Sequence, residues 1–210
     1  MVIFHNYGLE LASVQEAYER YKNLPPAARN MPPVAGNILW SRHLLRRIEG
    51  PMERFHVYPG VLQSKDSRKL IKTYNKVART LVAFEYMWYE AWCKTVEAAR
   101  GGLTATLIVR HPKSRRLYVN FDPEIRQLIS REAKCLSRMG VTLPDGAKMV
   151  LLQEDRFKDY YNELKHALRE YQRILRSIVP VMKDFLQPHV ESMESRLRPG
   201  WTVLTWTSMN

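Results

Sequence analysis

The feature that most constrains this chain is an apolar stripe that repeats in alternating steps of four and three residues between Lys65 and Ala99. Its members are Leu70, Tyr74, Val77, Leu81, Phe84, Trp88, Ala91 and Thr95. This spacing keeps them on one side of an α-helix. A helix of this length needs neighbouring helices to cover its apolar side. The pair Gly101-Gly102 is expected to end it.

A second stripe with the same spacing predicts another long helix later in the chain. Its members are Phe157, Tyr161, Leu164, Leu168, Tyr171, Leu175 and Ile178. Pro180 is expected to kink or end this helix, because proline lacks the amide hydrogen that a helix needs. Shorter apolar repeats bounded by Pro or Gly predict helices over about 13–24, 34–55, 123–139 and 185–197.

Between the two long stripes the period changes from helical to strand-like. Apolar and polar residues alternate from Leu103 to Arg110 and again from Leu117 to Phe121, with a turn around His111 to Arg115. A period of two on either side of a turn predicts a β-hairpin at about 103–121. The predicted fold class is therefore mainly α: an elongated helical bundle with long amphipathic helices and one inserted β-hairpin.

Two segments are expected along the chain. Residues 1–30 would form an N-terminal helix and an extended link, and residues 31–210 would form the helical bundle that contains the hairpin. A chain of 210 residues can bury a substantial core. Six large aromatic residues are expected to pack in that core: Trp40, Trp88, Trp92, Phe157, Tyr161 and Trp206.

The sequence carries none of the motifs that indicate phosphate or metal chemistry. There is no Gly-x-x-x-x-Gly-Lys-Ser/Thr or Gly-x-Gly-x-x-Gly loop, and the six histidines are dispersed. We therefore expect no catalytic residues, no cofactor, no metal and no enzymatic activity. Met1 to Glu10 lacks the pattern of a signal peptide, and no apolar run reaches the roughly 18 residues of a membrane helix. A cytoplasmic protein without a membrane partner is expected.

The two cysteines, Cys93 and Cys135, are too few for a disulfide framework. Each stands beside a large apolar residue in a helical pattern, which favours small, reduced, buried side chains. A thiol-dependent enzyme is the alternative to that interpretation. An abnormally fast thiol with a low pKa at either position would support it.

The charge is strongly basic, with 33 Lys and Arg against 21 Asp and Glu and a formal net charge of +12. Such a surplus favours an acidic partner. No acidic residue occurs between Glu97 and Asp122, whereas the expected hairpin carries Arg110, Lys113, Arg115 and Arg116. A second cluster on the helix after residue 34 includes Arg42 and Arg46. These six cations are the predicted partner-binding residues, and a merely solvated cationic surface is the alternative for both clusters.

The aromatic residues bear on whether the acidic partner is a nucleic acid. RNA-binding platforms expose aromatic rings on a sheet, whereas Tyr74, Phe84, Trp88, Tyr161 and Tyr171 follow helical core stripes. This pattern disfavours nucleic acid as a partner. An independent basic module that binds nucleic acid or tubulin remains the alternative function, and it would lose affinity steeply with salt.

Several short sequence segments together resemble the N-terminal tail of axonemal dynein heavy chains, and they are most similar to the outer-arm type. They occur in register over roughly residues 24–210, at 32–42, 47–52, 120–125, 132–136, 151–164 and 197–210. The resemblance implies a non-catalytic segment of a tail built from stacked helical bundles, whose ATPase ring lies elsewhere in the heavy chain. It further implies intermediate chains and a neighbouring heavy chain as partners, a place in the axoneme of cilia or flagella, and a role in scaffolding the motor complex and transmitting force.

One residue departs from the family pattern. Ser130 stands between Ile129 and Arg131, where the pattern runs directly from Leu-Ile into Arg-Glu-Ala-Lys-Cys. One added residue rotates the following side chains by about 100° unless a π-bulge absorbs it. The sequence therefore predicts a π-bulge near Ser130.

Overall fold

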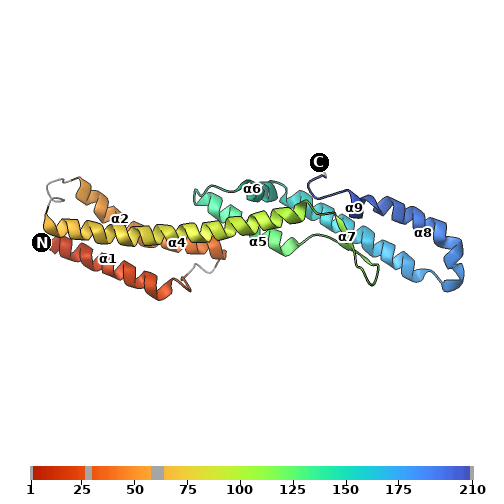
Figure 1. Cartoon of the computed structure of the whole chain (residues 1–210), viewed down its shortest axis with the longest axis horizontal. Coiled ribbons are helices and arrows are strands. Elements are labelled where there is room, and N and C mark those ends of the chain that lie inside the picture. The colour runs from red at the N-terminus through yellow and green to blue at the C-terminus, as the bar shows by residue number, and fades with distance from the viewer. Residues whose placement is uncertain (1, 27–29, 58–63, 209–210) are drawn as a thin grey trace. The chain divides into compact units, whose positions relative to one another are not determined.

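The computed structural model describes residues 2–26, 30–57 and 64–208, and the fold is mainly α with one inserted β-hairpin, as the sequence predicts (Figure 1). The elements are α1 (Val2–Tyr21), α2 (Pro33–His56), α4 (Lys65–Leu103), β1 (Ile108–Arg110), β2 (Leu117–Val119), α5 (Pro123–Arg138), α6 (Asp145–Leu152), α7 (Glu154–Ser177), the 3-10 turn η1 (Pro180–Met182), α8 (Lys183–Leu197) and α9 (Pro199–Thr202). The chain divides into two compact units. Unit 1 comprises Met1–Lys94 and Lys134–Thr142, and unit 2 comprises Thr95–Ala133 and Leu143–Asn210.

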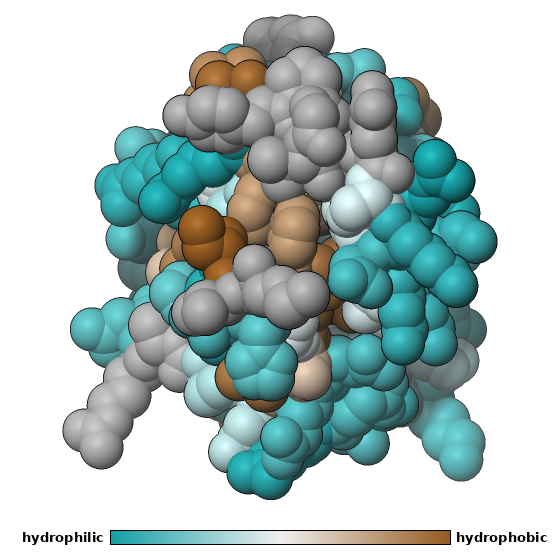
Figure 2. All heavy atoms as spheres, turned by 90° about the vertical axis from the view of Figure 1, so that its left-hand side faces the viewer, coloured by the Kyte–Doolittle hydropathy of each residue, from teal (hydrophilic) through white to brown (hydrophobic). Residues whose placement is uncertain are grey.

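The core of unit 1 lies where α1, α2 and the first part of α4 pack side by side (Figure 1). Leu11, Ile48 and Leu81, one from each helix, are almost completely buried. The Tyr7 hydroxyl on α1 donates a hydrogen bond of 2.8 Å to the Ile48 carbonyl oxygen on α2. Figure 2 views this unit from its end and shows apolar residues gathered between hydrophilic outer faces.

Helix α1 begins well before the predicted start near Ser13. Tyr7 and Leu11 are both buried and extend the apolar face that Val14 continues, so the packing stripe already exists in the first turns. The sequence interpretation was wrong there because Gly8 weakens the local helical signal. In the fold, Gly8 lies against α4, where an added Cβ would be 3.5 Å from the Leu70 side chain.

Helix α4 does not end at Gly101-Gly102 as predicted but continues to Leu103. Both glycines have open space around them, so nothing in the packing requires them. Leu103 is fully buried, and its carbonyl oxygen accepts a 3.3 Å hydrogen bond from the Thr207 amide. Burial of Leu103 therefore outweighs the roughly 1 kcal/mol by which each helical glycine disfavours the helix relative to alanine.

The hairpin is shorter than the predicted span of 103–121. Its strands contain three residues each and pair antiparallel, with Val109 opposite Tyr118. The region before β1 is held by contacts distant in sequence instead of by a longer ladder. The Leu107 amide donates to the Leu204 carbonyl oxygen at 3.0 Å, and Thr106 forms an isolated bridge with Thr205.

Helix α5 begins and ends as the sequence predicts. The Asp122 carboxylate accepts hydrogen bonds from the Glu124 and Ile125 amides at 3.0 and 3.1 Å, which satisfies two otherwise unpaired donors of the first turn. Pro123 occupies the first helical position. The chain leaves the helix through Gly140, whose φ of 73° lies in the left-handed region that glycine favours.

The predicted π-bulge near Ser130 is wrong, because α5 is a regular α-helix through that point. Ile129, Ala133 and Leu136 are all buried at the regular spacing of four and three, so no phase shift has to be absorbed. Ser130 is itself buried, and its hydroxyl donates a 2.6 Å hydrogen bond to the Glu154 carboxylate. A polar side chain at this position is therefore accommodated by a bond to α7 without a distortion of the helix.

The second predicted long helix is α7, which ends at Ser177 before Pro180. A separate short helix, α6, precedes it, and no helix was predicted for this segment. Helices α7 and α8 are connected through η1 and run back along each other (Figure 1). None of the described helices of the chain is long and apolar enough to cross a membrane.

Two glycines give a matched test of this packing. A Cβ at Gly200 would lie 2.6 Å from Cδ1 and 3.1 Å from Cγ1 of the buried Ile108, whereas a Cβ at Gly102 would meet no atom within 4 Å. We expect Gly200→Ala to lower the free energy of unfolding by about 1–2 kcal/mol through overpacking. Gly102→Ala should raise it by about 0.5–1 kcal/mol. Urea denaturation measures both, and equal effects would contradict the packing around β1.

Candidate partner-binding site

The tip of the hairpin is a four-residue loop, residues 112–115. The His111 amide donates to the Arg116 carbonyl oxygen at 2.8 Å, and the Arg115 amide donates to the His111 carbonyl oxygen at 2.9 Å. Arg115 has a φ of 58°, in the left-handed region that a side chain rarely adopts. The Ser114 amide donates to His111 Nδ1 at 3.1 Å. The loop therefore has a defined conformation that orients its cationic side chains.

Three of the predicted partner-binding cations, Lys113, Arg115 and Arg116, are exposed at this tip. Among residues 2–26, 30–57 and 64–208, no carboxylate lies within 4.0 Å of their charged nitrogen atoms. Their positive charge is uncompensated by the described part of the fold. The structure thus brings together at one place the charges that the sequence places in one acid-free stretch.

Arg110, the fourth predicted cation of the hairpin, has a different position. It lies at the end of β1, where its Nη2 is 3.4 Å from the Glu194 carboxylate of α8. Its guanidinium carbon is 4.9 Å from the centroid of the Trp201 ring. The Nε atom is buried and has no hydrogen-bond partner among the described residues. Arg110 therefore connects the hairpin to α8 and α9, and its charge is balanced within unit 2.

Glu194 holds a second group in addition to Arg110. The Tyr171 hydroxyl of α7 donates a 2.7 Å hydrogen bond to the same carboxylate oxygen, Oε1. Burial, assisted by this bond, raises the pKa of Tyr171 to about 12. One carboxylate of α8 thus anchors both a strand and a helix.

Two further side chains hold β2 and the residues that follow it. The Gln172 side-chain amide of α7 donates a 2.8 Å hydrogen bond to the Leu117 carbonyl oxygen. The Trp206 indole donates a 2.7 Å bond to the Asn120 carbonyl oxygen, and the Trp206 side chain is 1% exposed. These bonds fix the hairpin to two elements that are distant from it in sequence.

An aromatic cluster forms the base of the hairpin and contains three of the residues expected in the core. Phe121 contacts Trp206 and Tyr161 at centroid distances of 4.4 and 5.2 Å, and Phe157 lies 6.4 Å from Trp206. Phe157 and Trp206 are buried, and Tyr161 is half-buried. The Arg126 guanidinium lies 4.2 Å from the Phe121 centroid. Desolvation in these surroundings lowers the pKa of Arg126 to about 10.

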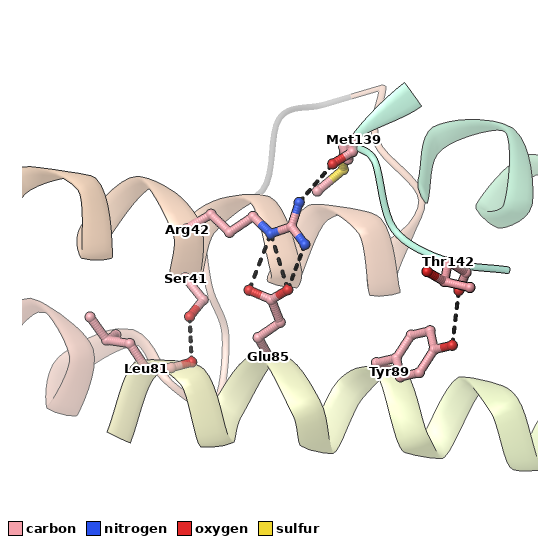
Figure 3. Close-up of polar contacts among 7 residues, drawn as sticks. All are labelled: Ser41, Arg42, Leu81, Glu85, Tyr89, Met139 and Thr142. Atoms are coloured by element: carbon pink, nitrogen blue, oxygen red, sulfur yellow. Dashed lines mark hydrogen bonds and ion pairs between the residues drawn. The ribbon is translucent and has the colours of Figure 1, made fainter. Parts of the chain in front are cut away.

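The second predicted cluster lies on α2 in unit 1. Arg42 makes a two-pronged ion pair with Glu85 of α4, with Nη2 and Nε at 2.7 and 3.0 Å from Oε1 and Nε at 3.2 Å from Oε2 (Figure 3). Its Nη1 donates a 2.8 Å hydrogen bond to the Met139 carbonyl oxygen, just past the end of α5. Arg46 is exposed. The structure therefore separates the two: Arg42 binds within unit 1, and Arg46 faces solvent.

Neighbouring bonds show that the Arg42 contact belongs to a set that fixes residues 134–142 within unit 1. The Tyr89 hydroxyl of α4 donates to the Thr142 carbonyl oxygen at 2.9 Å, and the Ser41 hydroxyl donates to the Leu81 carbonyl oxygen at 2.7 Å (Figure 3). A cation beside the carbonyl groups at a helix C-terminus is also favoured by the helix dipole. The Arg42 side chain is thus held by contacts within unit 1 and is not available to a partner.

The three remaining aromatic residues expected in the core belong to unit 1. Trp40 is 8% exposed and meets Phe84 edge to face at 5.6 Å between ring centroids. Trp92 is buried and Trp88 is half-buried, packed against the same core. The indole nitrogen atoms of Trp88 and Trp92 are buried without a hydrogen-bond partner in the described part of the chain.

Both cysteines are free thiols and are half-buried, which corrects the expectation of buried side chains. Cys93 follows Trp92, and Cys135 precedes Leu136, and these larger neighbours are the buried ones. Successive helical residues point about 100° apart, so the cysteines fall at the margin of the buried face. Within the described ranges, no group of three or more His, Cys, Asp or Glu side chains could hold a metal ion.

Sequence reasoning missed the residues that anchor the hairpin, namely Glu194, Trp201, Tyr171 and Gln172. Glu194 and Trp201 contact Arg110, Tyr171 binds Glu194, and Gln172 lies 55 residues from its partner Leu117, so each of these pairs is distant in sequence. No local pattern identifies such pairs. The only available signal was the set of large aromatic residues near the end of the chain, which needed partners in a folded structure.

Comparison with known proteins identifies the protein family to which this chain belongs. The whole chain, residues 1–210, matches the family model described as Dynein heavy chain, N-terminal region 1. The chain belongs to this dynein heavy-chain family. The resemblance found in the sequence is thereby confirmed, and the matched part is the N-terminal region of the heavy chain and not its ATPase ring.

Its relatives are axonemal heavy chains. The chain is 50% identical over 210 residues to the dynein gamma chain of the flagellar outer arm from Chlamydomonas reinhardtii, covering 100% of this chain and 5% of that protein. It is 37% identical over 209 residues to dynein axonemal heavy chain 5 of Mus musculus (100% and 4%) and 39% identical over 207 residues to dynein axonemal heavy chain 8 of Homo sapiens (99% and 5%). The dynein segment described here therefore spans about one-twentieth of the length of these relatives.

The different environments of Arg42 and Arg46 predict different effects of the same change in this dynein segment. Arg42→Gln removes the ion pair with Glu85 and the bond to the Met139 carbonyl oxygen, and should lower the free energy of unfolding by about 1–3 kcal/mol. Arg46→Gln removes the same charge from an exposed position and should change it by less than about 0.5 kcal/mol. Thermal denaturation of both variants tests this, and equal destabilisation would contradict the assigned contacts.

Proposed function

We propose that this chain is a structural, non-catalytic segment of an axonemal dynein heavy-chain tail, which scaffolds assembly of the motor complex and transmits force in cilia or flagella. The relatives' names place those proteins in the axoneme or in the flagellar outer arm, which supports this location. The proposed partners are other dynein subunits, such as an intermediate chain or a neighbouring heavy chain.

The observation that carries the proposed partner contact is the group of three exposed and unpaired cations at the tip, Lys113, Arg115 and Arg116. Uncompensated charge on an ordered loop attracts an acidic surface and orients the encounter. Arg110 serves this role indirectly, because its contact with Glu194 holds the strand that carries the tip. Arg46 is a secondary candidate contact, whereas the Arg42 side chain is already engaged by Glu85.

The proposed role in force transmission is supported by α4. This helix has 39 residues, which corresponds to about 58 Å at the usual rise of 1.5 Å per residue. Its residues 65–94 belong to unit 1 and its residues 95–103 to unit 2, and we propose that this unbroken helical backbone is the segment that carries load. A continuous helix resists extension better than an irregular linker, because its backbone bonds act together.

Affinity capture from flagellar extract tests the partner contact. The bait is the 210-residue chain, either unchanged or with Lys113→Glu, Arg115→Glu and Arg116→Glu, and the recovered dynein subunits are quantified by mass spectrometry. Arg110 is left unchanged because it anchors the hairpin. We expect the tip variant to recover these subunits at least about fivefold less well, because reversed charge repels an acidic surface.

A matched control carries three charge reversals elsewhere, Lys72→Glu, Lys76→Glu and Arg79→Glu. These are exposed cations of α4, so this control changes the net charge by the same amount. It should recover the subunits as well as the unchanged chain. Equal recovery by the tip variant and the unchanged chain would refute the hairpin contact.

A further inference from the structure

A groove of about 270 Å³ lies between β2 and α7, directly beyond the cationic tip along the chain. Its walls include Leu117 and Tyr118 of β2 and Lys165, Arg169 and Gln172 of α7. We call it the β2–α7 groove.

The charge that lines the β2–α7 groove has one sign. Lys165 and Arg169 are its charged lining residues, and no carboxylate contributes to its walls. Neither cation forms an ion pair with a carboxylate in the part of the chain that the structure describes. The partner of Lys165 is neutral, because its Nζ donates a 3.0 Å hydrogen bond to the Tyr161 hydroxyl.

Three acidic residues of α7, Asp159, Glu163 and Glu170, lie on the side of the helix opposite Tyr161, and Glu154 at the start of the helix accepts the Ser130 hydroxyl. At 100° per residue, Asp159, Glu163 and Glu170 are about 160–200° around the helix axis from Tyr161, which lines the groove. Glu170 is also already paired with Arg173. Beside the groove, Lys165 and Arg169 therefore lie on the side of α7 that faces β2, and Asp159, Glu163 and Glu170 lie on the other side.

The groove also offers apolar surface and a fixed shape. Tyr118 lines the groove and is 50% exposed, and its ring lies 6.4 Å from the His111 ring, so it offers apolar surface to a partner. Gln172 holds β2 and α7 together through its bond to the Leu117 carbonyl oxygen. Because both walls are ordered, a ligand would not have to order the groove itself, and this favours affinity.

We propose that the β2–α7 groove binds an acidic segment of a partner protein, with carboxylate side chains paired to Lys165 and Arg169 and an apolar side chain packed on Tyr118. This inference rests on the proposed function, since it adds to the contact at the tip a second contact site in the strand that follows the tip. Arg115 and Arg116 lead directly into β2, so one extended acidic segment can contact both.

The test uses the 210-residue chain and a fluorescein-labelled 14-residue peptide that contains six Glu and two Phe. The control is the same peptide with Gln in place of each Glu. Fluorescence anisotropy gives the dissociation constant for the unchanged chain, for the groove variant Lys165→Gln with Arg169→Gln, and for the control variant Lys72→Gln with Lys76→Gln. We expect the groove variant to bind about tenfold more weakly, the control variant to bind unchanged, and the Gln peptide to bind poorly to all three.

Carbodiimide cross-linking locates the peptide directly, because it joins a lysine amine to a carboxylate in contact with it. We expect mass spectrometry to find the peptide on Lys165 of the unchanged chain. Cross-links that avoid Lys165, or equal affinity of the groove and control variants, would overturn the proposal. So would a single-stranded DNA of equal charge that binds more tightly than the peptide and depends on the same two cations.

The tip variant Lys113→Gln with Arg115→Gln and Arg116→Gln separates this proposal from the function on which it rests. If peptide affinity depends on the tip but not on the groove, the groove proposal fails and the tip contact stands. If affinity depends on neither, both fail. Circular dichroism of each variant shows whether the fold is retained, and Tyr118→Ser supplies a second groove variant that leaves all charges in place and should weaken binding several-fold.

Discussion

The hairpin cannot exist without the helices around it. Two strands of three residues each bury too little surface to be stable in water on their own. Their position instead depends on bonds from distant elements: Gln172 to the Leu117 carbonyl oxygen, Trp206 to the Asn120 carbonyl oxygen, and Arg110 to Glu194. The proposed role of the tip depends on these contacts, because a loop at the end of an unsupported hairpin would have no fixed position from which to present its charges.

The same kind of side chain has two roles in this chain, and the position of the nearest carboxylate decides between them. Arg42 and Arg110 each face a carboxylate of another helix and stabilise the fold. Arg46 and the tip cations have no such partner among the described residues and carry their charge to the surface. A basic composition therefore does not produce one continuous basic surface, since some of the arginine side chains form ion pairs that connect secondary-structure elements.

The sequence predicted the parts of the fold that local chemistry determines. The stripe through Leu81 identifies α4, and Asp122 followed by Pro123 identifies the start of α5. The exceptions have a common cause in long-range packing. Leu103 extends α4 past two glycines because it is buried, and Ser130 stays in a regular helix because Glu154 accepts its hydroxyl.

In the candidate site too, the features set by local sequence could be predicted and those set by long-range contacts could not. The acid-free stretch that contains Lys113, Arg115 and Arg116 is visible in the sequence, and the structure places all three at one tip. Neither the anchoring of Arg110 nor the β2–α7 groove could be predicted, because both join β-hairpin residues to helical residues that are distant in the sequence, such as Gln172, 55 residues after Leu117. A spacing pattern within one element carries no information on such a pair.

Native-state hydrogen exchange of the hairpin amides tests the central claim most directly. The His111 and Asn120 amides donate to the Arg116 and Leu107 carbonyl oxygens at 2.8 Å and report on the two ends of the ladder. If the helices hold the hairpin as described, these amides exchange about as slowly as the buried turns of α7, and Trp206→Phe speeds the exchange at Asn120. Exchange of both amides at the rate of an unstructured loop, with α7 still protected, would contradict the account.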